Sequence, residues 1–152
     1  MTGGRIGIPE PMRIEHAELH AALVAATKAP GRVGEAARAV ARVLHPHFVR
    51  EEEIALPPLG LLEDLAAGVV MPDMAAVLPL TDALEAELPG MLREHAVIRT
   101  AVEALRDAAR AESQPEHAHT AEKILLHART EEQVTYPAAV LVGRTVKAAL
   151  GR

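Results

Sequence analysis

The 152-residue sequence contains no cysteine and no tryptophan, and it has one phenylalanine and one tyrosine. The absence of cysteine excludes disulfides, zinc–thiolate sites, iron–sulfur clusters and thiol nucleophiles. Aromatic residues make up only 1% of the chain, which leaves few side chains to stack on nucleic-acid bases. The chain has no basic run and carries a net charge of −5, so we expect no nucleic-acid partner.

Long hydrophobic runs are also missing. No apolar stretch approaches the roughly 20 residues of a membrane helix, so we expect no membrane partner. Residues 1–5 have no apolar stretch typical of a secretory signal, and we therefore expect a cytoplasmic protein. The composition, 49% hydrophobic and 24% charged, is typical of a soluble globular protein. The length suits a single domain over residues 1–152, with its core in residues 11–140.

Alanine and leucine are abundant, so helix is the expected structure wherever proline and glycine are absent. The pattern predicts long helices over residues 11–29, 32–55, 81–112 and 115–136, with a tail to residue 150. Thr81 is a candidate N-cap, and Pro89 and Pro137 are candidate kink sites. Residues 57–80 form a connector with a short helix at 61–67. Two short turns and one long connector predict an all-α, up-down four-helix bundle built from two helical hairpins.

An internal repeat is the strongest feature of the chain. Residues 47–57 and 127–137 both read His-x3-Glu-Glu-x4-Pro. A second pair of matching segments, 15–17 and 94–96, reads Glu-His-Ala. Each half therefore carries Glu-His-Ala on its first predicted helix and His-x3-Glu-Glu on its second, which indicates a duplicated helical hairpin.

A helical wheel at 100° per residue separates inward from outward positions. Six ionisable side chains fall on otherwise apolar faces: His16, His47, Glu51, His95, His127 and Glu131. Glu52 and Glu132 are rotated by about 100° toward a flank. On the last helix the predicted inward stripe is Ile124, His127, Glu131, Val134 and Ala138. The six ionisable groups are expected to meet in one layer of the bundle.

Four imidazoles and two carboxylates in an apolar layer predict a metal site. Nitrogen and oxygen donors suit iron, manganese or zinc. Six ligands exceed the need of one tetrahedral ion, and the duplication suggests two ions bridged by carboxylates. Open positions on such ions would attract hydroxide, oxide, peroxide or dioxygen.

Each part of the pattern also has a simpler interpretation. A single His-x3-Glu is commonly a surface pair, a lone inward histidine is commonly a hydrogen-bonded core residue, and residues 51–53 alone would be a solvated face. The recurrence of the motif favours the metal site. His20 could join His16 or lie on the surface. We expect the remaining histidines to lie in turns or on the surface: His45, His117 and His119. We expect Tyr136 to be a packing residue.

The set of motifs resembles the hemerythrin-like, HHE cation-binding domain over residues 16–137. The resemblance implies a four-helix bundle that holds two iron ions bridged by carboxylates and an oxo or hydroxo species. It implies that the four histidines are terminal ligands and that Glu51 and Glu131 are bridges. Oxygen-carrying hemerythrins have His-x3-His on the third helix, where this chain has Arg99, and His-x4-Asp on the fourth. One imidazole is therefore missing.

Three functions follow as hypotheses. The first is a non-haem di-iron protein that senses or handles dioxygen, peroxide or nitric oxide. The second is a di-iron oxidoreductase with peroxidase- or catalase-like activity, in which Tyr136 is the only aromatic residue near the ligands of the last helix that could relay an electron. The third is a metal-free helical interaction module whose His/Glu layer is a hydrogen-bonded network. The sequence indicates no particular protein partner.

Overall fold

The computed structural model describes residues 5–152, and within them every regular element is helical. Residues 1–4, which belong to the predicted domain and to the N-terminal stretch without the apolar pattern of a secretory signal, lie outside the described residues. The long helices are α1 (Glu10–Thr27), α2 (Gly31–Ile54), α4 (Leu78–Ala111) and α5 (Pro115–Thr130). A π-helical turn, η3 (Glu131–Thr135), joins α5 to α6 (Tyr136–Leu150). The connector between α2 and α4 contains η1 (Pro57–Leu61), α3 (Leu62–Ala66) and η2 (Pro72–Val77).

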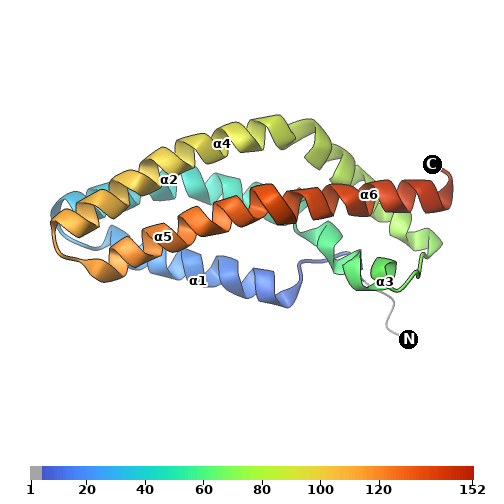
Figure 1. Ribbon diagram of the computed structural model, residues 1–152, viewed down its shortest axis with the longest axis horizontal. Coiled ribbons are helices and arrows are strands. Elements are labelled where there is room, and N and C mark those ends of the chain that lie inside the picture. The colour runs from blue at the N-terminus through green and yellow to red at the C-terminus, as the bar shows by residue number, and fades with distance from the viewer. Residues whose placement is uncertain (1–4) are drawn as a thin grey trace.

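The helices form a closed ring in which α1 packs on α2, α2 on α4, α4 on α5, and α5 on α1. Figure 1 shows these four helices side by side, with α6 continuing α5 past the end of the bundle toward the connector. The predicted all-α four-helix bundle is confirmed. Among residues 5–152, no helix is both long enough and apolar enough to cross a membrane.

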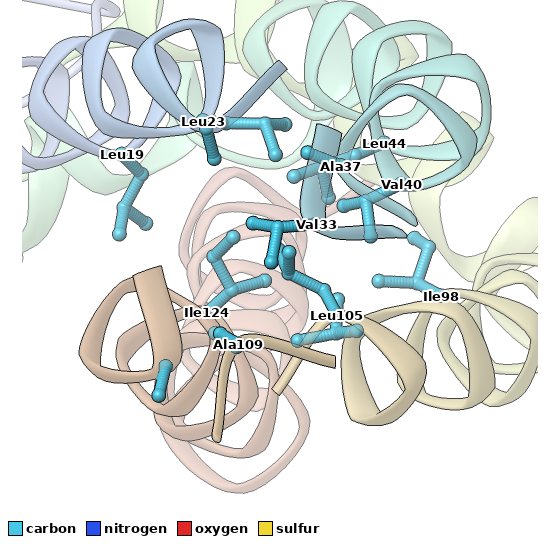
Figure 2. Packing of buried hydrophobic residues seen from close by; sticks show 14 of the residues in the cluster. Leu19, Leu23, Val33, Ala37, Val40, Leu44, Ile98, Leu105, Ala109 and Ile124 are labelled. Carbon is cyan, nitrogen blue, oxygen red and sulfur yellow. The ribbon is translucent and has the colours of Figure 1, made fainter. Parts of the chain in front are cut away.

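Apolar side chains fill the bundle in separate clusters. One cluster fills the end near the α1–α2 and α4–α5 turns, and Leu23, Leu44 and Ile124 meet there between the helices (Figure 2). A second cluster, which includes Ile54, Met91 and Tyr136, lies farther along the bundle. Burying such side chains contributes about 1.5–3 kcal/mol each, so the two clusters hold the helices on either side of the layer between them.

The start of α4 differs from the sequence prediction. The helix predicted over residues 81–112 begins at Leu78, because Pro79 lies in its first turn, where a missing N–H costs nothing. Thr81 is consequently not an N-cap. It is buried inside the helix, and its hydroxyl donates to the Leu78 carbonyl at 3.3 Å. The proline expected to kink this helix, Pro89, lies inside α4, which continues through it.

The last predicted helix differs most. It was expected to end near residue 136, but η3 carries it into α6. The wider π turn changes the rotation of the residues that follow it. Val134, predicted to face inward, is therefore 61% exposed, whereas Thr135 and Tyr136 are buried. Pro137, which has no N–H and cannot make the regular hydrogen bond inside a helix, lies in the first turn of α6, two residues after the end of this π turn.

The contact between α6 and α4 yields a stability prediction. A Cβ atom added at Gly143 would lie 2.3 Å from Thr81 Oγ1, whereas one added at Gly90 would lie 3.6 Å from the end of the Arg93 side chain. We expect Gly143→Ala to lower the free energy of unfolding by about 1–3 kcal/mol through overpacking. Gly90→Ala should raise it by up to about 1 kcal/mol through helix propensity. Urea unfolding of both variants tests this, and a stabilised Gly143→Ala protein would contradict it.

Candidate metal centre

The four helices bring the six predicted site residues into one layer. α1 contributes His16, α2 contributes His47 and Glu51, α4 contributes His95, α5 contributes His127 and η3 contributes Glu131. Five of the six are buried, and the side chain of His127 is only 9% exposed. The convergence predicted from the helical wheel is thus present in the fold, although the role of these residues as ligands stays a prediction.

The donor atoms form two groups that share one residue. His47, Glu51, His95 and Glu131 each offer an atom within 4.8 Å of the others, and so do His16, His127 and Glu131. The two oxygens of Glu131 divide between the groups. Its Oε1 lies 3.5 Å from His95 Nε2, and its Oε2 lies 3.2 Å from His127 Nε2 and 3.8 Å from His16 Nε2. Glu131 is therefore the residue whose carboxylate faces both donor groups.

Glu51 is placed differently from its partner in the repeat. Its Oε1 lies 3.4 Å from His47 Nε2, and it belongs to only one of the two donor groups. The sequence pattern made Glu51 and Glu131 equivalent. The structure gives the two groups different donor sets, with four residues in the first and three in the second.

A second ring of glutamates surrounds the histidines. The Nδ1 atom of each histidine contacts a glutamate carboxylate on the next helix around the bundle. The pairs are His16–Glu52 at 3.2 Å, His47–Glu94 at 2.6 Å, His95–Glu132 at 3.0 Å, and His127–Glu15. These outer glutamates are the first residue of each Glu-His-Ala segment and the second glutamate of each Glu-Glu pair. The repeated motifs therefore encode both rings.

The outer ring decides how the imidazoles face the centre. An ionised carboxylate only accepts hydrogen bonds, so each Nδ1 carries the proton and donates it outward. The other ring nitrogen, Nε2, then presents its lone pair to the interior, which is the tautomer that binds a metal. Arg99, at the position where oxygen-carrying hemerythrins have a histidine, donates to Glu132 at 3.2 Å. It supports the outer ring and does not enter the centre.

The inner atoms fit a cation. Four buried atoms have no hydrogen-bond partner in the described part of the chain: His16 Nε2, Glu51 Oε1, His127 Nε2 and Glu131 Oε2. In addition, the Nε2 atoms of His47 and His95 lie 2.9 Å apart. Unsatisfied buried acceptors are expensive, and bound cations would satisfy them together. The donor set therefore fits metal ions.

The electrostatics of the layer reflect the crowding of two carboxyl groups. Burial raises the pKa of Glu51 well above its usual range, and the neighbouring Glu131 raises it further. Burial acts in the same direction on Glu131, but its close contacts with Glu51 and with three histidines hold its pKa well below that range. For a histidine, whose protonated form is the charged one, burial acts in the opposite direction. It lowers the pKa of His47, although the hydrogen bond to Glu94 raises it.

Sequence reasoning expected Tyr136 to be a packing residue, or an electron relay under the oxidoreductase hypothesis, and did not place its hydroxyl among the site residues. Its hydroxyl donates to Glu51 Oε2 at 2.8 Å and lies 3.1 Å from His95 Nε2 and 3.2 Å from His47 Nε2. Burial and the nearby carboxylates raise the pKa of this hydroxyl, so it stays protonated. On a regular helical wheel Tyr136 points away from Glu131, and only the π turn brings it inward. The proline inside the continuing helix, Pro137, was the available signal.

The remaining histidines lie outside the layer. His20 and His45 are exposed on α1 and α2, with ring centroids 6.2 Å apart. His117 and His119 lie at the start of α5, far along the chain from the ligand candidates of that helix. None of these four belongs to either donor group found among the described residues.

A four-helix bundle with a buried layer of histidines and carboxylates defines a class of helical metal-binding proteins. The family model for the hemerythrin HHE cation binding domain matches residues 7–139, and the chain belongs to this family. The resemblance stated from the motifs is thereby confirmed, and membership implies cation binding. No curated protein and no solved structure matches the chain.

The two rings of glutamates should differ in their effect on a bound cation. We expect Glu51→Gln and Glu131→Gln to abolish retention of at least one ion, because a neutral amide is a poor ligand. Glu52→Gln and Glu132→Gln should weaken binding by about 10- to 100-fold without removing an ion, because they act through His16 and His95. Metal analysis after gel filtration measures this for the four single variants. A larger loss from the outer pair would contradict the assignment.

Proposed function

We propose that this protein is a non-haem di-iron protein that senses or handles dioxygen, peroxide or nitric oxide. The observation that carries the proposal is the pair of donor groups that share Glu131, with four inner atoms left unpartnered. Two groups of this kind suit two ions. Mixed imidazole and carboxylate donors suit iron, although manganese and zinc accept similar ligands. An oxo or hydroxo bridge would complete the centre.

Iron held there would supply reversible one-electron chemistry and open positions for a small ligand. The chain contributes the orientation of the imidazoles through the outer glutamates and the exclusion of bulk water through the two apolar clusters. The group of His16, His127 and Glu131 has three donor residues and the other group has four, so an ion in the first would keep more coordination positions open.

The grooves on the surface of the bundle and the burial of the inner atoms favour a small ligand. A groove of about 530 Å³ between α2 and α4 is lined by His47 and Glu94, and one of about 440 Å³ between α1 and α5 is lined by His127 and Glu15. Both grooves touch the outer edge of an imidazole, whereas the inner atoms of the layer are buried. Molecules of two to four atoms, such as dioxygen, nitric oxide or hydrogen peroxide, match this restricted access better than an organic substrate.

One observation favours the oxidoreductase as a second candidate. Tyr136 places a buried phenol against the donor group of His47, Glu51 and His95, where it could supply one of the two electrons and one of the two protons that reduce hydrogen peroxide to water, with bound iron supplying the second electron and solvent the second proton. Steady-state consumption of hydrogen peroxide by the iron-loaded protein separates turnover from sensing. The metal-free module is the weaker hypothesis, because it leaves buried acceptors unsatisfied.

Iron content tests the proposed function directly. We expect about two iron ions per chain after anaerobic loading with ferrous iron and exposure to air. The double variant Glu51→Ala plus Glu131→Ala should fall well below one, because it removes both inner carboxylates. The control is the double variant Glu18→Ala plus Glu35→Ala, which removes two exposed glutamates and therefore the same amount of negative charge. It should still bind two ions. An iron ratio near zero in the unmodified protein would contradict the proposal.

Folding and metal binding should be coupled. Ions bound only by the native state stabilise it, and here they also satisfy four buried atoms. We expect the melting temperature to rise by several degrees or more on loading, because 1 kcal/mol corresponds to about 2–4 °C in a chain of this size. Calorimetry with and without iron measures the shift. Equal melting temperatures would show that the layer is satisfied without metal.

A further inference from the structure

The two halves of the repeat differ at one position next to the centre. Leu56 precedes the proline of the first repeat, and Tyr136 precedes the proline of the second. Both side chains are 1% exposed and belong to the same apolar cluster. Only Tyr136 carries a polar atom, and that atom lies against the donor group of His47, Glu51 and His95.

The hydroxyl of Tyr136 fixes which oxygen of Glu51 is free and which side of the layer that oxygen faces. It donates to Oε2 of Glu51 at 2.8 Å, so this oxygen is already engaged. Oε1 has no hydrogen-bond partner and lies 3.4 Å from His47 Nε2. The carboxylate is therefore held with its free oxygen on the side of His47 and His95. Its repeat partner, Glu131, has no such restraint and faces both donor groups.

The opposite group has an apolar neighbour instead. The ring of Phe48 stacks on His16, with centroids 4.0 Å apart and planes 11° apart, and it offers no hydrogen-bond donor or acceptor. The His16–His127 group therefore has three donor residues and an apolar side, whereas the His47–His95 group has four donor residues and a phenol. This asymmetry comes from neighbouring side chains, since the ligand motifs themselves are duplicated.

We propose that Tyr136 is a positioning residue that makes the two metal positions unequal. It commits Glu51 to the His47–His95 position, which then binds the first ion tightly. The His16–His127 position binds the second ion more weakly and keeps the coordination sites that an external ligand would use. This inference rests on the proposed metal-binding function, but it concerns the order and inequality of the two ions.

Titration with cobalt(II) tests the proposal, because its visible bands report both occupancy and coordination. We expect the unmodified protein to bind two ions in separate steps whose affinities differ by about tenfold or more, equivalent to about 1.4 kcal/mol. In Tyr136→Phe both oxygens of Glu51 are free, so the affinities of the two binding steps should come to lie within about threefold of each other. The spectrum of the first-bound ion should also change, which a purely structural role would not cause.

Leu56→Met provides the matched control, because it alters the corresponding position of the other repeat without adding or removing a hydroxyl. It should preserve both steps and the first spectrum, and a thermal melt should show that both variants fold. Two well-separated steps and an unchanged first spectrum in Tyr136→Phe would overturn the role of Tyr136. A single step in the unmodified protein would overturn the inequality. Failure to bind any cobalt would instead count against the proposed function.

Discussion

The structure depends on placing six ionisable side chains in the middle of an apolar bundle. Each buried charge costs several kcal/mol unless it is paired and hydrogen-bonded. The chain meets this cost in two ways. Outer glutamates accept hydrogen bonds from the Nδ1–H groups of all four histidines, and the inner atoms face one another so that a cation can satisfy them together. The clusters of apolar side chains on either side hold the helices at the spacing that this layer requires.

The outer pairs also explain how the layer is tied to the fold. Each histidine is bonded to a glutamate of the neighbouring helix, so the pairs pass from α1 to α2, α4, α5 and back to α1. The outer glutamates are partly exposed, and individual surface pairs of this kind contribute little stability. Their effect is orientation, because each fixes the tautomer and angle of an imidazole that approaches the centre.

The duplicated hairpin does not produce a symmetric site. A π turn in the second half rotates Tyr136 into the layer, whereas the first half ends its helix at Ile54 and buries Leu56 there. A change in the winding of a few residues therefore adds a phenol to one side of the centre. Duplication accounts for the matching histidines and glutamates, and a local departure from regular α-helix made their surroundings different.

Periodicity and repetition alone predicted the helical bundle and the six inward residues, because burial on an α-helix follows a 3.6-residue period. The same reasoning failed at Val134 and Tyr136, since a wheel assumes an unbroken α-helix and η3 breaks it. It also could not show which helices face each other, so it left Glu51 and Glu131 equivalent and the outer glutamates on an undefined flank. Only the tertiary structure decided that Glu131 faces both donor groups and that Glu94 and Glu15 bond to His47 and His127, because these contacts join segments far apart in the chain.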